Sequence, residues 1–343
     1  MEAECEAFTR NHSFDDETPP PGVNIVGAKW LFRAKQLPDE APVFEARYVA
    51  KGFTQQQYLD LFKAFSPTSK PPTARTLLDV AAREDFEIKC MDASSAFLQG
   101  RLKEIVFMDR PESFPGEFPP NTVWKLNRPV YGLKQVPCEW HNKTKEVLLS
   151  LDFHPSSADP TIFIHRHSER FYILVYVDDF ILASKDSALM TSVQEALSKV
   201  PLMKELGDLK HYLGMEIIRD RPARTISLSQ EFHIDNVLKW FEMELCTPMA
   251  TLLPLQHLLT APAVHTPEAC TEPYPELVGS LMYAMMCTRP DLTYLFSVLS
   301  RYVATGRFTE LQWKTAKGVR AICRALSHMY SCLWFSSSSG RLH

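Results

Sequence analysis

The fold of this chain is built around FYILVYVDDFILAS, residues 171–184. Two apolar runs rich in β-branched and aromatic residues, 171–177 and 180–183, flank a pair of adjacent carboxylates, Asp178 and Asp179. Such runs are typical of buried strands, and the short interruption predicts a β-hairpin with the acids at its tip. Two aspartates at a rigid tip repel each other, so we expect a divalent metal ion there, because carboxylates are preferred ligands of hard cations. The alternative is an ordinary turn, since Asp tolerates turn geometry.

The chain has 343 residues, of which 45% are hydrophobic and 23% charged, as is typical of a globular protein with two or three subdomains. No apolar run approaches the roughly 20 residues that span a bilayer, so no membrane contact is predicted. The acidic N-terminus MEAECEAFTR lacks the apolar segment of a secretory signal. The eight cysteines are scattered without a C-x-x-C pair, which argues against a zinc site and suits a reducing compartment.

The charge is distributed unevenly. The formal net charge of −4 gives no global sign of a nucleic-acid partner. Between Lys29 and Arg75, however, eight Lys or Arg residues stand against four Asp or Glu residues, a local net charge of +4. This segment is either a modest electrostatic footprint for phosphates or an ordinary solvated surface.

Strands and helices are mixed without the regular alternation of a doubly wound sheet, so the sequence predicts an α+β fold. Residues 1–27 contain TPPPG and no apolar pattern, and we expect a flexible leader there. Besides the central hairpin, strands at 28–35 and 43–53 are predicted to form a second hairpin, and further strands are predicted at 87–92 and 104–111. Helices are predicted at 73–85 with Thr73 as N-cap, after Pro137, at 188–200, at 313–329, and as a pair within 275–304 separated at Arg289 and Pro290.

A third carboxylate, Asp92, ends the predicted strand EIKCMD, 86 residues before Asp178. An acid at one strand end that faces an acidic hairpin on a neighbouring strand can hold two Mg²⁺ ions ~3.5–4 Å apart. In phosphoryl transfer, one such ion activates the attacking hydroxyl and the other neutralises the leaving pyrophosphate. Taken alone, Asp92 is more typical of a strand-end cap.

Six blocks now carry a resemblance: ARYVAKGFTQ, MDASSAFLQG, VYGLKQVPCEWH, YVDDFILAS, LGDLKHYLGMEI and GSLMYAMMCTRPDLTY. Together they resemble the reverse transcriptase of copia-type LTR retrotransposons (Pseudoviridae), in that family's order and spacing over residues 24–335. The resemblance implies a right-hand polymerase of fingers, palm and thumb with an antiparallel palm sheet. The implied regions are a leader at 1–27, fingers at 28–89, palm at 90–218 with a fingers insertion around 110–140, a thumb-like region and linker at 219–274, and a helical connection at 275–335 toward an absent ribonuclease H domain.

The same resemblance implies roles for the acids. Asp92, Asp178 and Asp179 match the three catalytic, metal-binding aspartates of the palm, which hold two Mg²⁺ ions, with Mn²⁺ as a substitute. Asp178 is expected to matter more than Asp179, because the family's metals depend more on the first acid of the pair.

Further matches concern the nucleotide. Phe97 matches an aromatic steric gate against a 2′-hydroxyl, with a core aromatic as the alternative. Arg47 matches the fingers arginine that lies against the triphosphate. Lys35 is a looser match to the lysine on the γ-phosphate, with Arg33 or an exposed strand charge as alternatives. Tyr131 and Gly132 match a loop that supports the template base and the nucleotide, where glycine permits close backbone approach; the plain alternative is a turn before a helix.

The segment Leu213-Gly214-Met215, followed by Glu216, resembles the primer grip, an apolar hairpin that holds the primer's 3′ end. One departure concerns the usual P-R-x-W motif, in which Cys138 replaces the arginine, so a cation near the template groove is lost. We expect a fragment of a longer polyprotein, with ribonuclease H and integrase regions as neighbours. The expected location is the cytoplasm, in a virus-like particle when the element is intact.

The sequence therefore predicts an RNA-directed DNA polymerase core that joins dNTPs to a primer 3′-hydroxyl on an RNA or DNA template. The competing interpretation is a catalytically inactive remnant that folds and at most binds nucleic acid. A third, an unrelated two-metal phosphohydrolase, is disfavoured because a hydrolase has no need of a cationic hairpin before the palm.

Phe97→Ala is expected to relax discrimination against ribonucleotides by at least about tenfold, which corresponds to ~1.4 kcal/mol, because the implied clash with the 2′-hydroxyl disappears. The measurement compares the catalytic efficiencies of primer extension with dNTP and with rNTP. An unchanged ratio would remove the gate role from Phe97.

Overall fold

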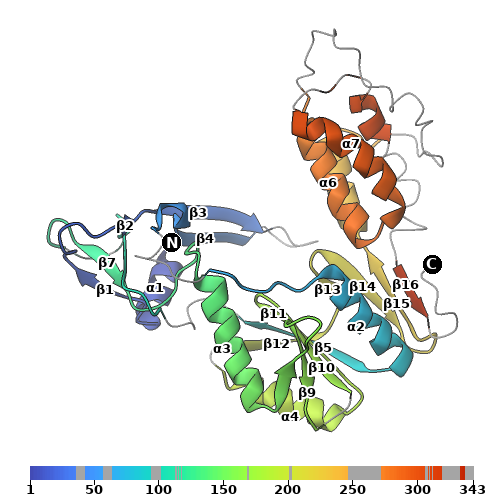
Figure 1. Ribbon diagram of the computed structural model, residues 1–343, viewed down its shortest axis with the longest axis horizontal. Coiled ribbons are helices and arrows are strands. Elements are labelled where there is room, and N and C mark those ends of the chain that lie inside the picture. The colour runs from blue at the N-terminus through green and yellow to red at the C-terminus, as the bar shows by residue number, and fades with distance from the viewer. Residues whose placement is uncertain are drawn as a thin grey trace. The chain divides into compact units, whose positions relative to one another are not determined.

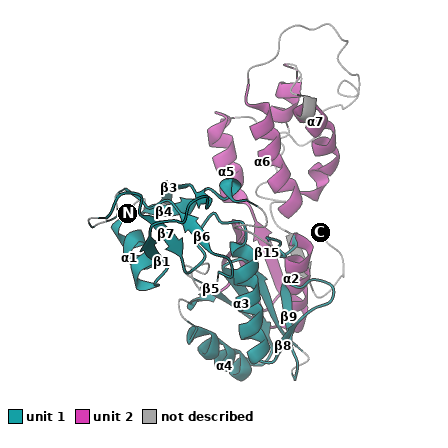
Figure 2. Ribbon diagram, turned by 60° about the vertical axis from the view of Figure 1, so that its left-hand side comes forward, with its two compact units in different colours: residues 1–70, 88–207 teal, residues 71–87, 208–343 magenta. Residues whose placement is uncertain are grey.

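The computed structural model describes residues 1–35, 43–56, 64–93, 102–112, 114, 116, 118–167, 170–200, 203–245, 272–305, 308, 310, 312–318 and 333–336 (Figure 1). The chain forms two compact units: residues 1–70 with 88–207, and residues 71–87 with 208–343 (Figure 2). Helices and sheets are mixed in both, so the predicted α+β class is confirmed. The expected fingers segment 28–89 is divided between the units, and the finer fingers, palm and thumb boundaries stay a prediction.

Unit 1 contains a six-stranded sheet around the central hairpin. Its order is β12 (Met203–Asp208), β5 (Glu87–Ala93), β11 (Asp179–Ser184), β10 (Phe171–Tyr176), β9 (Ile162–His165) and β8 (Phe153–Pro155). The pairs β10–β11, β10–β9 and β8–β9 are antiparallel. On β10, Ile173 and its neighbour Leu174 are both fully buried although they point to opposite faces. A strand buried on both faces has a continuous apolar run, which is the pattern of the central hairpin in the sequence.

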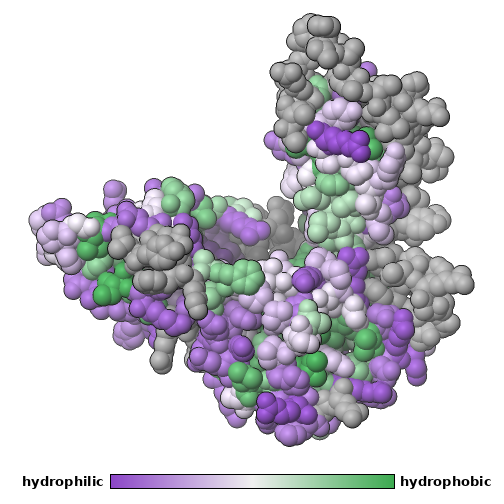
Figure 3. All heavy atoms as spheres, viewed as in Figure 1, coloured by the Kyte–Doolittle hydropathy of each residue, from purple (hydrophilic) through white to green (hydrophobic). Residues whose placement is uncertain are grey.

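Two helices pack on one face of this sheet. α3 (Val136–Ser150) contributes a buried stripe of Trp140, Thr144 and Leu148, spaced by four residues. α4 (Ser187–Ser198) begins after Asp186, whose carboxylate accepts the Leu189 N–H at 2.9 Å as an N-cap. Apolar residues of both helices join those of β10 and β11 in one core cluster. Figure 3 shows that the outward surface of this layer is largely hydrophilic, which is the complementary half of the same pattern.

The rest of unit 1 is a smaller β-rich subdomain that includes the N-terminus. Its sheet has the order β1 (Phe14–Glu17), β7 (Val123–Leu126), β6 (Val106–Met108) and β2 (Ile25–Val26). The predicted hairpin is confirmed as β3 (Ala28–Lys35) paired antiparallel with β4 (Val43–Ala50). β4 ends before the predicted residue 53, because the chain turns into a short 3₁₀ helix, η1 (Gly52–Thr54).

The prediction of a flexible leader at residues 1–27 was wrong. The segment forms α1 (Glu2–Arg10), β1 and β2, and Phe8 on α1 is only 2% exposed. The Phe8 ring lies 5.4 Å from the Trp124 ring, and Phe14 stacks on the same indole at 4.0 Å. Residues 1–27 contain too few apolar residues to predict an ordered segment. The Trp124 side chain that packs on Phe8 and Phe14 belongs to β7, which is distant in the sequence.

Unit 2 combines a sheet with a group of helices. Its sheet has the order β13 (His211–Tyr212), β14 (Met215–Asp220), β15 (Thr225–Ser229) and β16 (Leu333–Ser336), with α2 (Pro71–Glu84) against β15 and β16. α2 starts two residues before Thr73, so Thr73 is not its N-cap. After α2, Asp85 accepts hydrogen bonds from Arg219 at 3.2 Å and Arg221 at 2.9 Å, which join the helix to the end of β14.

The predicted helix pair is confirmed as α6 (Tyr274–Cys287) and α7 (Thr293–Thr305), separated by η4 (Pro290–Leu292). With α5 (Glu231–Trp240) they enclose an apolar cluster that includes Ile234, Leu281 and Leu299. Most of the predicted linker and of the predicted helix 313–329 lies outside the described residues. Of the helices described, none is both long and apolar enough to cross a membrane.

Phe8→Ala is expected to lower the free energy of unfolding by about 3–5 kcal/mol, because it removes a buried ring from a packed cluster. Phe53→Ala is the matched control, since Phe53 is 78% exposed and the same change there should cost less than about 0.5 kcal/mol. Urea denaturation of the two variants measures both values. Equal, small effects would show that the N-terminal helix does not contribute to the core.

Candidate active site

The hairpin of β10 and β11 places its two acids in different positions. Tyr176 is paired with Asp179, so the two-residue turn consists of Val177 and Asp178, and Asp179 is the first residue of β11. The sequence predicts both acids at the tip, but the register leaves only Asp178 in the turn. Val177 takes a φ of +54°. A positive φ at the first of two turn residues is typical of a type II′ hairpin turn.

Asp92 comes to the same place from the neighbouring strand. β5 lies beside β11 in the sheet, and the Ala93 N–H donates to the Asp178 carbonyl oxygen at 2.9 Å. Asp92 directly precedes Ala93, so the ends of the two strands bring three carboxylates together. The three carboxylates lie close enough to interact, since the negative charge of Asp92 raises the pKa of Asp178 and of Asp179.

Asp178 is the most strongly perturbed of the three acids. Burial raises its pKa to about 6, and the nearby carboxylates of Asp92 and Asp179 add to the effect. Burial is also the main cause of the raised pKa of Asp179. The same negative charges help burial to raise the pKa of the Cys90 thiol on β5 to about 11. This end of the sheet therefore has an excess of negative charge.

A cation fits this arrangement. The Oδ1 atom of Asp178 is buried and has no hydrogen-bond partner among the described residues, although buried carboxylate oxygens are normally satisfied. A metal ion at Asp178 would supply the partner and offset the repulsion from Asp92 and Asp179. Within the described ranges, no three His, Cys, Asp or Glu side chains are arranged as a finished metal-binding group. The carboxylates are thus gathered at one place without being placed around a single ion.

Arg47 and Tyr131 belong to the same site. The Arg47 guanidinium on β4 lies 4.8 Å from the centre of the Tyr131 ring and 3.7 Å from the Glu45 carboxylate. Its charge lowers the pKa of Asp178, in opposition to burial. Burial raises the pKa of Tyr131 to about 12, and Asp178 and Asp92 contribute to that shift. A cation and an aromatic ring therefore accompany the carboxylates, while the predicted contacts of Arg47 and Tyr131 with a nucleotide stay a prediction.

Of the other residues predicted to contact the nucleotide, the structure describes the side chain of Arg33 but not those of Lys35 and Phe97. Arg33 is paired with Glu45 and Leu31 with Arg47, so the register puts Arg33 on the same face of the β3–β4 hairpin as Arg47. Lys35 ends β3, but its side chain lies outside the described part of the chain. Phe97 also lies outside it, so its gate role stays a prediction.

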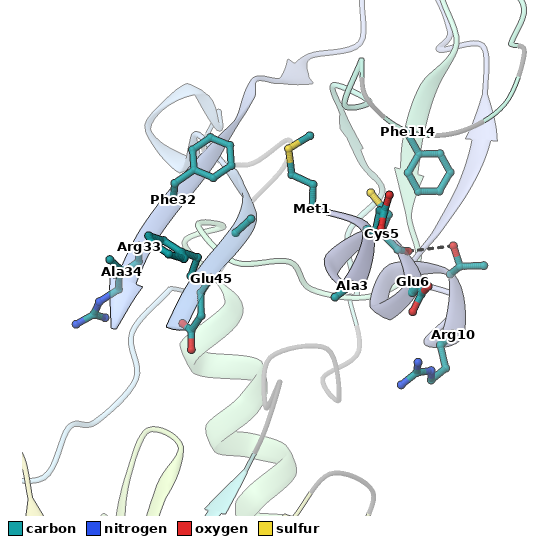
Figure 4. A pocket seen from close by; sticks show the side chains of 14 residues that line it. Met1, Ala3, Cys5, Glu6, Arg10, Phe32, Arg33, Ala34, Glu45 and Phe114 are labelled. Carbon is teal, nitrogen blue, oxygen red and sulfur yellow. Dashed lines mark hydrogen bonds between the residues drawn. The ribbon is translucent and has the colours of Figure 1, made fainter. Parts of the chain in front are cut away.

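A large cavity of unit 1 is distinct from the carboxylates. It has a volume of about 1360 Å³ and lies between α1 and the β3–β4 hairpin (Figure 4). Phe32, Arg33 and Glu45 line it from the hairpin, and Cys5 and Arg10 line it from α1. None of the predicted catalytic acids is among its lining residues. The candidate site is thus identified by charge and geometry, not by the size of a cavity.

Two sequence blocks interlock beside the site in a contact that was not predicted from the sequence. The Gln55 side chain donates to Gln135 Oε1 at 2.9 Å and accepts the Lys134 N–H at 2.8 Å. A Cβ atom on Gly52 would lie 2.1 Å from the Gly132 carbonyl oxygen, so both backbones need the absence of side chains there. The available signal was the repeated G-x-x-Q spacing, at residues 52–55 and 132–135.

Gly132 has a second reason to be glycine. Its φ is +93°, and a Cβ atom there would meet the Ala50 carbonyl oxygen at 2.1 Å. The Ala50 N–H donates to the Tyr131 carbonyl oxygen at 2.8 Å. The close backbone approach predicted for Gly132 is therefore present, but it is an approach to β4. That contact fixes Tyr131 next to Arg47.

The predicted primer-grip residues form a tight turn in unit 2. Tyr212 is paired with Met215, and the two turn residues, Leu213 and Gly214, take φ values of +48° and +74°, the type I′ pattern. The Met215 side chain is buried. The Tyr283 hydroxyl on α6 donates to the Leu213 carbonyl oxygen. The sequence identified the turn but missed Tyr283, whose only signal was its place in the block GSLMYAMMC.

Residue 138, the departure noted in the sequence, lies in the first turn of α3. Cys138 is partly exposed, and the Asn142 side chain lies 3.8 Å from its sulfur. Lys103 pairs with the adjacent Glu139 at 3.2 Å. The cation next to this position, Lys103, is therefore paired with Glu139 and does not take the place of the missing arginine.

Comparison with known proteins gives a consistent result. Residues 11–255 match the family model described as reverse transcriptase (RNA-dependent DNA polymerase). The chain is 36% identical over 348 residues to the retrovirus-related Pol polyprotein from transposon TNT 1-94 of Nicotiana tabacum, an alignment that covers 98% of this chain and 26% of that protein. It is 35% identical over 324 residues to the corresponding polyprotein from transposon RE2 of Arabidopsis thaliana, covering 93% of this chain and 22% of that protein.

A solved structure of the foamy viral protease-reverse transcriptase in complex with ds DNA aligns with a TM-score of 0.48 and 12% identity, over 94% of this chain and 46% of that one. The chain spans about a quarter of the length of the curated polyproteins that it matches. The resemblance to copia-type reverse transcriptases is confirmed by the family match and by these relatives.

Asp178→Asn is expected to stabilise the metal-free protein at pH 8. The raised pKa of Asp178 means that ionising this residue costs folding free energy, so its contribution is most favourable below pH 4 and is lost as the pH rises through about 6. After allowance for solvent screening, the neutral amide should raise the free energy of unfolding by roughly 1–2 kcal/mol at pH 8.

Urea denaturation in EDTA at pH 4 and pH 8 measures this difference, which should shrink at the lower pH. Glu146→Gln is the control, because Glu146 is an exposed acid on α3 and its replacement should have little effect at either pH. A stabilisation that is independent of pH would contradict the assignment to Asp178 ionisation.

Proposed function

Because the chain belongs to the reverse transcriptase (RNA-dependent DNA polymerase) family, we propose that Asp92, Asp178 and Asp179 form its catalytic centre for joining dNTPs to a primer 3′-hydroxyl. The observation that carries the proposal is the gathering of three mutually repelling carboxylates at the ends of β5 and β11. Gathering these carboxylates lowers the stability of the protein. Such an arrangement is typical of functional sites, where a cation or a charged substrate interacts with the acids. The substrates are dNTPs and a primed RNA or DNA template.

Two divalent ions, Mg²⁺ or in its place Mn²⁺, are the cofactors in this proposal, held by Asp92, Asp178 and Asp179. When bound, they would lower the pKa of the attacking hydroxyl and neutralise charge on the leaving pyrophosphate. The fit rests on the orphaned Oδ1 atom of Asp178 and on the donor set, since carboxylate oxygens are what these cations prefer.

The remaining work falls to the side chains around the acids. The Arg47 guanidinium is half exposed and lies on the Tyr131 ring, so it can turn toward a triphosphate and donate two parallel hydrogen bonds to its oxygens. Arg33 on the same strand face, and Lys35 at the end of β3, would add positive charge. The Tyr131 ring, released from Arg47, would offer an apolar face to the base.

The turn of Leu213, Gly214 and Met215 is proposed to hold the primer end, as its resemblance to a primer grip implies. Its type I′ geometry gives a rigid backbone corner suited to that role. In the full polyprotein, ribonuclease H and integrase regions would act on the same nucleic acid. For an intact element we place the reaction in a cytoplasmic virus-like particle.

A second candidate function is favoured by one observation. Cys138 stands where an arginine was expected, and a lost cation near the template groove would weaken duplex binding. In this alternative, the chain folds and binds nucleic acid but no longer polymerises.

Primer extension distinguishes the two. With a primed RNA template, dNTPs and Mg²⁺, the wild-type chain should extend the primer, and Asp178→Asn should reduce the rate by at least about a hundredfold, since a charge-stabilising group is lost from the reacting centre. Glu146→Gln is again the matched control and should retain full activity. If all three proteins are folded and equally inactive, the non-catalytic alternative is correct.

A further inference from the structure

We propose that Trp140 is a positioning residue that fixes the Val177-Asp178 turn and so sets the place of the Asp178 carboxylate. This inference rests on the proposed function of the three acids. Trp140 lies on α3 and is 5% exposed, and no functional role has been assigned to it above. Its indole N–H donates to the Val177 carbonyl oxygen at 2.7 Å. The indole has a single donor, and here it is directed at the backbone next to Asp178.

Both carbonyl groups of the turn are held from outside the hairpin. The Val177 oxygen accepts the Trp140 indole N–H, and the Asp178 oxygen accepts the Ala93 N–H at 2.9 Å. The two donors come from different elements, the helix α3 and the strand β5. The turn is therefore fixed at two consecutive peptide groups, and a rotation of either group would break a hydrogen bond in a buried setting.

The turn needs this support because its own geometry is unfavourable. Val177 takes a φ of +54°, a backbone conformation that L-residues with a branched Cβ rarely adopt. Glycine is the residue that this turn type prefers at that position. The hydrogen bond from the Trp140 indole to the Val177 carbonyl oxygen stabilises the turn against this strain.

Electrostatic repulsion acts on the turn in the same unfavourable sense. The carboxylates of Asp92 and Asp179 repel that of Asp178, which favours movement of the turn away from β5. The indole N–H bond opposes such movement from the helix side. Without it, we expect the Asp178 carboxylate to shift, and a displaced ligand weakens the binding of a metal ion. Loss of groups that orient metal ligands typically costs about 10–100-fold in affinity or activity.

Packing is the competing explanation for Trp140. The ring belongs to the same core cluster as Phe180 and Leu148 and borders a small cavity of about 50 Å³. A test must therefore separate loss of the N–H from loss of volume. Trp140→Phe removes the donor and keeps an aromatic ring. Leu148→Val is the matched control, because Leu148 is on the same helix, lines the same cavity and has no contact with the turn backbone among the bonds described.

Three measurements on the full chain decide the role. Exchange of the Ala93 amide hydrogen reports whether the turn stays docked on β5, Mn²⁺ binding reports the ligand geometry, and primer extension separates turnover from the apparent affinity for dNTP. For Trp140→Phe we expect at least about tenfold faster Ala93 exchange and roughly tenfold weaker Mn²⁺ binding. Turnover should fall roughly 10–100-fold, while KM should change by less than about threefold. Leu148→Val should lower stability alone.

The outcomes separate this proposal from the proposed function. If Trp140→Phe matches Leu148→Val in Ala93 exchange and in Mn²⁺ affinity, Trp140 only packs, and the positioning role is overturned. If the wild type binds Mn²⁺ no better than Asp178→Asn and extends no primer, the catalytic proposal fails. In that event, faster Ala93 exchange in Trp140→Phe still supports the positioning of the turn, and unchanged exchange still overturns it.

Discussion

One constraint acts on the six-stranded sheet of unit 1: the carboxylates of Asp92, Asp178 and Asp179 repel one another at the ends of two adjacent strands. Burial and like charge both oppose the ionised forms of Asp178 and Asp179, so the surrounding structure must hold the acids where they would not gather by themselves. A sheet buried on both faces supplies the rigidity, because its central strands cannot slide without exposing apolar side chains.

A contact between residues 52–55 and residues 132–135 also supports the site. Arg47 and Tyr131, which the sequence linked to nucleotide binding, lie near the acids. Gly132, linked to the same role, instead joins the loop before α3 to β4 and to the residues that follow it. Gly52 and Gly132 allow the backbones to touch, and Gln55 closes the contact with two hydrogen bonds. A motif can therefore be retained for the contact that positions a functional residue as much as for the contact with substrate.

The sequence predicted the central hairpin, the β3–β4 hairpin, and the pair α6 and α7, because each has a strong local pattern of apolar residues or turn formers. It failed where the deciding partner is distant in the chain. Phe8 lies in a segment predicted to be a flexible leader, because the Trp124 ring that packs on it comes from more than a hundred residues later in the chain. The convergence of Asp92 with the hairpin was inferred from the family pattern, but the bond from Trp140 to the turn depends on the packing angle of α3, which no local pattern records.

The division of the chain into units has a consequence for how the protein is made. The chain passes from one unit to the other after residues 70, 87 and 207, so α2 leaves the ribosome long before its sheet partners β15 and β16. At roughly 5–20 residues per second, the apolar face of α2, including Leu77 and Leu78, waits on the order of ten seconds for the residues that cover it. During synthesis there is thus a stage at which unit 1 can fold while α2, which lies between the two segments of unit 1 in the sequence, still exposes its apolar face. A chaperone or self-association would act at that stage.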